Sequence, residues 1–240
     1  MRPLAVLALA LLAPLAAAQA ASTPRLTVDG AASLTEVFPR IDASERYEFA
    51  GSDQLALQIA QGQPADVFAA ASPRYPEQLY AQGLVEKPVV FATNTVVLIV
   101  PKRNPAGIRS VYDVAKPGVK LVVGDPSVPI GAYTQKALAA LKLNVKPVSQ
   151  ETDVKNVVAK VALGEADAGF VYSSDVKPVQ GKVLVFRLPP VAGPTAVYEL
   201  AIVRSTKHHT AAAAFVRRLL SKRGQAPLHA AGFGPIPPGS

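Results

Sequence analysis

The sequence predicts an α/β protein, and three observations support this prediction. Strand-like and helix-like segments alternate along almost the whole chain, as they do in α/β proteins with mostly parallel strands. Half of the 240 residues are hydrophobic, which is ample for a buried core. The chain contains no repeat with a period of about 20–50 residues, which excludes a solenoid. Two lobes fit this length better than one, although a single doubly wound sheet has the same local pattern.

The first part of the chain begins with an alternating strand and continues with amphipathic helices. Apolar residues at Leu34, Val37, Phe38 and Ile41 follow the spacing of one helix face, and two later segments repeat such a stripe. The expected strands of this part are 25–32, 47–50, 66–70, 89–91 and 95–100, and the expected helices are 34–41, 55–60 and 75–83.

The second part of the chain shows the same alternation of strand-like and helix-like segments. Its helices have apolar stripes such as Val154, Val157, Val158 and Val161, and its strands are short apolar runs. The expected strands are 120–125, 169–172, 183–186 and 197–203, and the expected helices are 131–142, 153–164 and 210–223. The apolar segments 89–101 and 196–204 are the best candidates for two crossings between lobes. On that interpretation the C-terminal helix returns to the first lobe.

The first 20 residues have the pattern of a secretory signal peptide. A positive start at Arg2 precedes an apolar run, and Ala18-Gln19-Ala20 provides the small-x-small cleavage pattern. An N-terminal membrane anchor is the alternative, since residues 3–24 carry no charge. No cysteine is present to hold a lipoprotein anchor. We expect export to the periplasm or another extracytoplasmic compartment as a soluble protein after cleavage.

The composition argues against several classes of chemistry. The absence of cysteine excludes disulfides and thiol catalysis, and the three histidines all lie in the last 33 residues, so a His-rich metal centre is not expected. The net charge of +8 is scattered along the chain. Its densest cluster is most simply a solvated helix face, formed by Arg217, Arg218, Lys222 and Arg223. We therefore expect no nucleic-acid partner.

Candidate binding residues lie where strands lead into helices. Small or hydroxyl residues precede four expected helices, in the segments 31–33, 51–53, 129–131 and 151–153. The first turn of a helix has unpaired N–H groups and the positive end of the helix dipole, so it attracts anions. Taken singly, Ser33 and Ser52 are ordinary helix N-caps. Several such turns converging on one cleft would instead bind a small oxyanion without any charged side chain.

Taken together, seven segments resemble the family of periplasmic molybdate-binding proteins, the solute receptors of molybdate ABC transporters. The segments run in order over nearly the whole mature chain, and they are 31–35, 51–59, 62–69, 97–105, 124–133, 164–175 and 232–235. The resemblance implies a two-lobed periplasmic binding protein of the class II type, with mixed sheets flanked by helices and a ligand cleft between the lobes. The implied division is a signal peptide at 1–20, lobe 1 at 21–93 plus 205–240, and lobe 2 at 94–204.

The resemblance also implies a binding site made of five residues. Ser33 and Ser52 would supply hydroxyl and backbone N–H groups, Ile130 and Val154 backbone N–H groups, and Tyr172 its phenolic O–H. The chain departs from the family in two places. The stretch between Ser33 and Ser52 is several residues shorter, which predicts a trimmed first helix. Ile130 replaces a small residue, which retains the N–H donor but narrows the cleft.

A site made only of neutral donors suits a fully deprotonated dianion. Molybdate, tungstate and sulfate carry no proton near pH 7, whereas phosphate keeps one that needs an acceptor, and leaving it unpaired costs about 1–3 kcal/mol. The carboxylates that would accept it, Asp53 and Asp175, are expected to face solvent or the first turn of a helix. We therefore expect molybdate and tungstate to bind, with no cofactor and no direct metal-ion ligand.

The partners implied by the resemblance are an ABC permease and its ATPase, and the receptor itself is expected to be a monomer and not an enzyme. One alternative keeps the fold but changes the ligand to sulfate, phosphate or another anion. A more distant alternative is an exported α/β hydrolase. That enzyme would need a Gly-x-Ser-x-Gly nucleophile elbow, which the sequence lacks.

Overall fold

The computed structural model describes residues 24–239, and its elements confirm the α/β prediction. The predicted signal peptide lies outside the described residues. The strands are β1 (Thr27–Ala31), β2 (Arg46–Ala50), β3 (Val67–Ala70), β4 (Val89–Pro101), β5 (Leu121–Gly124), β6 (Ser149–Glu151), β7 (Ala168–Tyr172), β8 (Val183–Arg187) and β9 (Thr195–Ile202). The α-helices are α1 (Phe38–Ile41), α2 (Ser52–Ala60), α3 (Arg74–Ala81), α4 (Pro129–Ala140), α5 (Val154–Ala162), α6 (Ser173–Val176), α7 (His209–Leu220) and α8 (Lys222–Ala231). Four short 3-10 helices are η1 (Ala32–Leu34), η2 (Val111–Ala115), η3 (Lys177–Val179) and η4 (Pro190–Ala192).

The strands form a mixed arrangement in the order β2-β1-β3-β9-β4-β7-β5-β6, with β8 also paired to β4. Strands β1, β2 and β3 are parallel to one another, as are β5, β6 and β7. The two central strands, β4 and β9, run antiparallel to each other, β9 is also antiparallel to β3, and β4 to β7 and β8. This topology confirms the mixed sheets flanked by helices.

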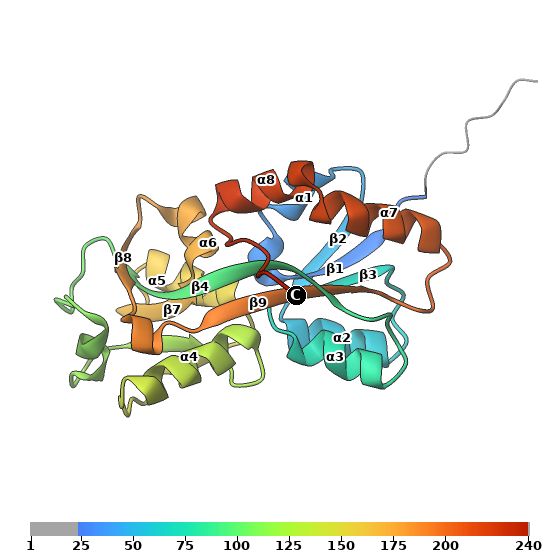
Figure 1. The fold of residues 1–240 in the computed structure, drawn as a ribbon. Helices are drawn as coiled ribbons and strands as arrows, with labels where there is room; N and C mark the ends of the chain where they lie inside the picture. Colours follow the sequence, from blue (N-terminus) through green and yellow to red (C-terminus); the bar gives the residue numbers. More distant parts are fainter. Residues whose placement is uncertain (1–23, 240) are drawn as a thin grey trace, which may run out of the picture.

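Two lobes are joined by the long strands β4 and β9, which run side by side through the middle of the molecule (Figure 1). We call the half built on β1–β3, with α1–α3, α7 and α8, lobe 1, and the half built on β5–β8, with α4–α6, lobe 2. Strand β4 joins the two expected strands 89–91 and 95–100 into one. The backbone of Thr93 and Asn94 continues the pairing with β9, since ladder hydrogen bonds do not depend on apolar side chains.

One aromatic chain in the core runs from lobe 1 to lobe 2 through these central strands. Phe38 packs on Phe91, Phe91 on Tyr198, and Tyr198 on Tyr172, with ring centroids 5.8–5.9 Å apart. Tyr172 then meets Tyr133 edge-on at 6.4 Å. Such edge-to-face packing fixes ring orientation as well as burying area. The site tyrosine Tyr172 is therefore held by both the crossing strands and α4.

The expected helix over 34–41 is not continuous, and this prediction was wrong in its extent. The chain forms η1, a turn, and then the four-residue α1. Pro39 lies at the start of α1, where its missing N–H is harmless. A helix running through from Leu34 would bring the Pro39 ring against the carbonyl of Thr35, so the longer helix is excluded. The first helix is thus short, in agreement with the trimmed helix that the resemblance implied.

The expected helix over 210–223 also differs, because it ends at Leu220 and a second helix, α8, follows. Ser221 has extended backbone angles, and its hydroxyl oxygen accepts the N–H of Gly224 at 3.2 Å, which starts α8. Gly224 approaches the end of α7 so closely that an added Cβ would lie 2.1 Å from the Arg218 carbonyl oxygen. Strand β6 was not expected either, since it has only three residues and all of them are polar.

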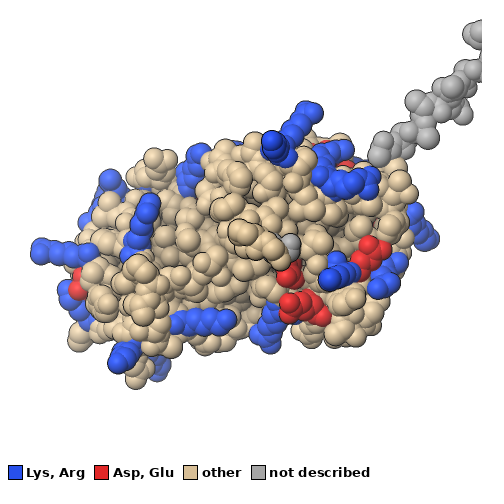
Figure 2. Space-filling view, in the orientation of Figure 1, with Lys and Arg blue, Asp and Glu red and all other residues tan. Residues whose placement is uncertain are grey.

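Basic side chains are spread over the face of the molecule shown in Figure 2 and form no single patch there. Arg217, Arg218, Lys222 and Arg223 are all exposed, as expected for a solvated helix face, and Arg218 pairs with Asp42. Within residues 24–239, no helix is both long enough and apolar enough to cross a membrane.

Candidate functional site

The structure places all five sequence-predicted site residues around one small cavity between the lobes. Ser33, Ser52, Ile130, Val154 and Tyr172 line a space of about 210 Å³. That figure includes space open to solvent, and the part that the centre of a water molecule can reach is only about 10 Å³, close to the minimum for one buried water. Each of the five residues is at most 4% exposed. The cavity is therefore small and lined by buried residues.

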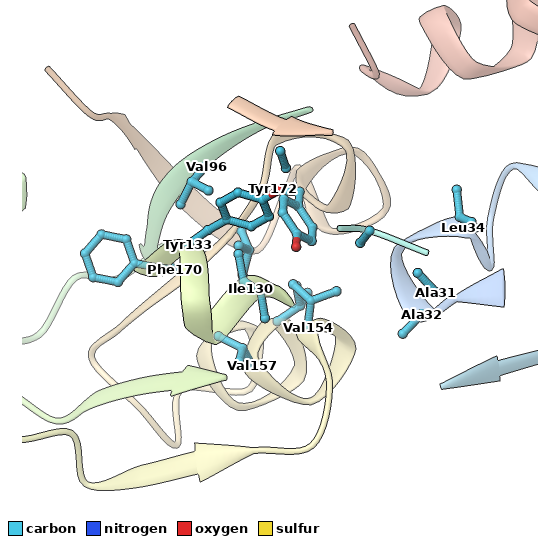
Figure 3. Close-up of a cluster of buried hydrophobic side chains, with 14 of the residues drawn as sticks. Ala31, Ala32, Leu34, Val96, Ile130, Tyr133, Val154, Val157, Phe170 and Tyr172 are labelled. Atoms are coloured by element: carbon cyan, nitrogen blue, oxygen red, sulfur yellow. The ribbon is translucent and has the colours of Figure 1, made fainter. Parts of the chain in front are cut away.

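Both lobes contribute strand-to-helix junctions to the wall. Lobe 1 supplies the start of η1 after β1 and the start of α2 after β2, and lobe 2 supplies the starts of α4 and α5 and the end of β7. In Figure 3, Tyr172, Ile130 and Val154 form one side, and Ala31 and Ala32 lie opposite them. This placement follows the rule that ligands gather at the carboxyl ends of strands in α/β sheets.

The helices present free N–H groups to the cavity. In α2 the first intrahelical bond comes from the N–H of Leu55 to Gly51, and in α4 from Ala132 to Val128. The N–H groups of Ser52 and Ile130 precede these bonds, so they have no partner within their own helices. The same holds for Val154, the first residue of α5. Three helix N-termini thus direct N–H groups and positive dipole ends at one small space.

The three hydroxyl groups of the site differ in their partners. Ser52 Oγ accepts the backbone N–H of Ala71 at 3.1 Å, which leaves its own hydrogen available for the cavity. Ser33 Oγ lies 2.8 Å from the hydroxyl of Tyr198. The Tyr172 hydroxyl is buried and has no hydrogen-bond partner among the described residues. Burial raises the pKa of Tyr172 well above its ordinary value, so this hydroxyl keeps its proton and remains a donor.

The cavity wall holds no lysine or arginine among the described residues, and one carboxylate, Asp153. Both oxygens of Asp153 are used by Asn156, whose backbone and side-chain N–H groups donate to them at 3.0 and 2.8 Å. Asp153 is therefore the N-cap of α5, with each oxygen already accepting one hydrogen bond. Asp153 belongs to the segment 151–153 that the sequence analysis placed before this helix, and the structure identifies it as the N-cap.

The two carboxylates singled out from the sequence have other partners. Asp53 lies in the first turn of α2, and its Oδ2 accepts the Ser127 hydroxyl at 3.0 Å. Asp175 is 1% exposed and lies in the first turn of α6, which confirms the second of the two settings expected for it, a helix first turn and not solvent. Its Oδ1 lies 3.2 Å from Lys155 Nζ in the first turn of α5. Burial raises the pKa of the Asp175 carboxyl and Lys155 opposes that rise. Neither carboxylate lines the cavity.

The bulky side chain of Ile130 is accommodated by a glycine that the sequence did not single out. An added Cβ at Gly124, the last residue of β5, would lie 2.6 Å from Ile130 Cγ2. The Cγ2 methyl group of Ile130 therefore packs against the end of β5, at the position where Gly124 has no side chain. Gly131 allows α4 to start close to the same strand, since a Cβ there would lie 1.9 Å from the Asp125 carbonyl oxygen. The N–H of Ile130 is thereby held at the cavity.

Several contacts join the two lobes near the cavity. Besides the bond between Asp53 and Ser127, the Tyr75 hydroxyl of lobe 1 donates to the Ser127 carbonyl oxygen of lobe 2. Gly51 of lobe 1 lies against Thr152 and Val128 of lobe 2. Sequence reasoning missed Tyr75 and Ser127, because only the tertiary structure brings residues so distant in sequence together. Among the described residues, no group of three or more His, Asp or Glu side chains is placed to hold a metal ion.

Tyr172→Phe tests whether the unpartnered hydroxyl is a ligand. Removing a donor from a buried dianion is expected to weaken oxyanion binding by about 1.5–3 kcal/mol, roughly 10- to 150-fold. The stability of the ligand-free protein should not fall, since the hydroxyl has no protein partner to lose. Titration calorimetry and denaturant unfolding of the same variant check both parts. Unchanged affinity would show that this hydroxyl does not contact the ligand.

Comparison with known proteins agrees with this geometry. A model of the bacterial extracellular solute-binding protein family matches residues 42–234. The molybdate-binding protein ModA of Mycobacterium tuberculosis (strain ATCC 25618 / H37Rv) is 38% identical over 218 residues, covering 87% of this chain and 84% of that protein. The periplasmic molybdate-binding protein of Azotobacter vinelandii has the same fold, with a TM-score of 0.77 at 22% identity over 87% of this chain and 98% of that one.

The fold by itself does not distinguish between oxyanions. The sulfate-binding protein SubI of Mycobacterium tuberculosis H37Rv has a TM-score of 0.76 at 19% identity, covering 89% of this chain and 88% of that one. The choice of ligand must therefore be argued from the site.

Proposed function

This chain belongs to the family of bacterial extracellular solute-binding proteins, and from that premise we propose that it binds molybdate between its two lobes. The observation that carries the proposal is the cavity, which is lined by three hydroxyls and three helix N-termini from both lobes and by no cationic side chain among the described residues. The identity to molybdate-binding relatives over most of the chain supports the choice of molybdate. Tungstate, which has the same charge and shape, is proposed as a second ligand.

Each predicted site residue has a proposed role. The hydroxyls of Ser33, Ser52 and Tyr172 donate to the ion, and the backbone N–H groups of both serines, Ile130 and Val154 complete its shell. Neutral donors suffice because a small desolvated dianion strengthens every hydrogen bond it accepts.

The protein's place in transport is proposed on the same basis. After cleavage of the signal peptide, the protein acts outside the inner membrane as a monomeric receptor and delivers the ion to an ABC permease and its ATPase. It binds its ligand without transforming it and needs no cofactor. The proposed lobe boundaries are 21–93 plus 205–240 and 94–204, with the lobes opening about β4 and β9.

A thermal-shift panel of molybdate, tungstate, sulfate and phosphate tests the proposal. A ligand at 100 times its Kd stabilises the folded state by about 2.7 kcal/mol. For a chain of this size that corresponds to a rise in Tm of roughly 5–11 °C. We expect this rise with molybdate and tungstate. A clear shift with sulfate or phosphate and none with molybdate would instead assign the same site to another oxyanion.

A further inference from the structure

An ion pair lies next to two residues of the cavity wall, and the proposed ligand set gives it no role. Asp175 is in the first turn of α6, three residues after Tyr172, and Lys155 follows Val154 in the first turn of α5. Lys155 Nζ lies 3.2 Å from Asp175 Oδ1. The pair therefore joins two chain segments that both begin at the cavity.

The two members of the pair differ in their access to water. The Asp175 side chain is fully buried, and neither of its oxygens has a hydrogen-bond partner among the described residues. The Lys155 side chain keeps 28% of its surface exposed. A buried carboxylate without a counter-charge is strongly unfavourable, whereas water can solvate a partly exposed ammonium group. Asp175 therefore depends on Lys155 more than Lys155 depends on Asp175.

The charge of Asp175 acts on tyrosine hydroxyls at the cavity. Burial, and after it the carboxylate of Asp175, raises the pKa of Tyr198 well above its ordinary value. Burial is also the largest cause of the raised pKa of Tyr172, and the Asp175 carboxylate adds to that rise after Tyr198 and Tyr133. An ion that accepts a hydrogen bond from Tyr172 therefore lies within range of the same charge, which little water screens.

The sign of this charge opposes an anionic ligand. A carboxylate repels an oxyanion, and an ammonium group beside the carboxylate cancels that repulsion. Burial raises the pKa of the Asp175 carboxyl, Lys155 opposes the rise, and the carboxylate of Asp153 at the start of α5 adds a smaller rise. Lys155 is the one cation paired with Asp175 among residues 24–239.

We propose that Lys155 is a positioning residue for charge, which neutralises Asp175 and so allows the cavity to accept a dianion. The proposal rests on the proposed function, and it adds a residue outside the cavity wall that determines the affinity. Lys155 acts through Asp175 and does not contact the ion.

Three variants separate this effect of charge from mechanical support, because each of them removes the ion pair. Lys155→Met leaves a buried carboxylate unpaired, and molybdate affinity at pH 8 is expected to fall at least roughly tenfold. Asp175→Asn leaves a lysine that water can solvate, so the affinity should stay or rise. The double variant leaves neither charge and should regain the unaltered affinity within about threefold. A pair that only tied α5 to α6 would make all three variants lose affinity alike.

The pH profile of binding gives a second readout, which mechanical support would not change. In Lys155→Met only a proton can neutralise the carboxylate, so molybdate affinity should fall as the pH rises from 6 to 9. The tyrosines near Asp175, Tyr172 and Tyr198, keep their protons in this range because their pKa values are raised. The unaltered protein and the double variant should show no such fall. Titration calorimetry at each pH measures these affinities.

Lys160→Met is the matched control on the same helix. Lys160 lies five positions after Lys155 on α5 and pairs with the largely buried Glu151 at 2.6 Å, and neither residue lines the cavity. This variant also removes an ion pair from α5, but it is expected to keep the affinity and the pH profile of the unaltered protein.

The outcomes distinguish the inference from the function on which it rests. If the unaltered protein binds no molybdate, the proposed function fails and the inference falls with it. If it binds molybdate while Lys155→Met keeps the same affinity at pH 8 and pH 9, only the inference is overturned. A tenfold loss in Asp175→Asn or in the double variant would overturn it as well. These two variants bury no unpaired charge, so they test the inference even if Lys155→Met does not fold.

Discussion

Gly51→Val is expected to weaken molybdate binding by about 3 kcal/mol or more, at least roughly 100-fold, by preventing the lobes from closing. Gly51 lies directly before α2, and its Cα faces lobe 2. An added Cβ would lie 2.6 Å from the carbonyl oxygen of Thr152 and 3.3 Å from Val128 Cγ1 in lobe 2, and 2.6 Å from Asp53 Oδ1, a side-chain atom of lobe 1 that can rotate away. The Thr152 oxygen belongs to the backbone, so it does not move aside as a flexible side chain would. Relief requires lobe 2 to retreat, which withdraws the N-termini of α4 and α5 from the ion.

The stability of the ligand-free protein should fall less than the affinity does, because separation of the lobes relieves the contact with Thr152 and rotation of the Asp53 side chain relieves the contact within lobe 1. Titration calorimetry measures the affinity, and thermal unfolding without ligand measures the stability. Gly181→Val is the matched control, since a Cβ at Gly181 meets no atom within 4 Å and its φ is not in the left-handed region. Wild-type affinity in Gly51→Val would show that contact between the lobes at this point is not needed for binding.

Asp29→Asn is expected to raise the free energy of unfolding at pH 8 by about 2–4 kcal/mol. Asp29 is fully buried on β1, and neither carboxyl oxygen has a hydrogen-bond partner among the described residues. Burial, with smaller contributions from the carboxylates of Glu48 and Asp66, raises the pKa of Asp29 from 3.8 to about 7. At pH 8 the folded protein therefore holds an unpaired buried charge, which the asparagine lacks.

The raised pKa of Asp29 also predicts how the free energy of unfolding depends on pH. Between pH 4 and pH 7 the folded protein binds more protons at Asp29 than the unfolded chain does, so its stability falls as the pH rises. Above about pH 7 this contribution is constant. Asp29→Asn should remove this slope, as denaturant unfolding at pH 5, 6, 7 and 8 would measure.

A surface carboxylate provides the control for that experiment. The side-chain bond to Lys116, with backbone bonds from Arg109 and Ser110, lowers the pKa of Asp113 to about 2. Asp113 therefore titrates below pH 4, and Asp113→Asn should leave the slope between pH 5 and pH 8 unchanged. An unaltered slope in Asp29→Asn would mean that Asp29 is not the group responsible.

Local sequence patterns predicted most of the elements because each pattern reports one buried face. The stripe of valines from Val154 to Val161 becomes the buried side of α5, and the apolar run at 169–172 becomes β7. The apolar pattern did not predict the elements correctly where proline, a helix cap or backbone pairing determined the local structure. Pro39 interrupted the first stripe, Ser221 divided the last helix, and the polar strand β6 formed through backbone pairing with β5.

The site residues could be predicted because they lie in segments that resemble a known family, and because most of them lie where an expected helix begins. Ser33, Ser52, Ile130, Val154 and Tyr172 reach one cavity as expected. Their role as ligands is a prediction that the binding experiments must test. Tyr198 had no comparable signal, since it lies in the middle of an ordinary apolar strand and meets Ser33 across 165 residues of chain.

The amino-acid sequence alone determined the alternation of strands and helices, the positions of the helix starts, and the lack of cysteine at any site. These properties depend on neighbours within a few residues, so they can be read along the chain. Only the tertiary structure decided that the hydroxyls of Ser33 and Tyr198 lie within hydrogen-bond distance, that Asp29 and Asp175 lie buried, and that Gly51 lies against the opposite lobe. Those outcomes depend on distances between segments far apart in the chain, and burial and hydrogen-bond direction exist only once the segments have packed.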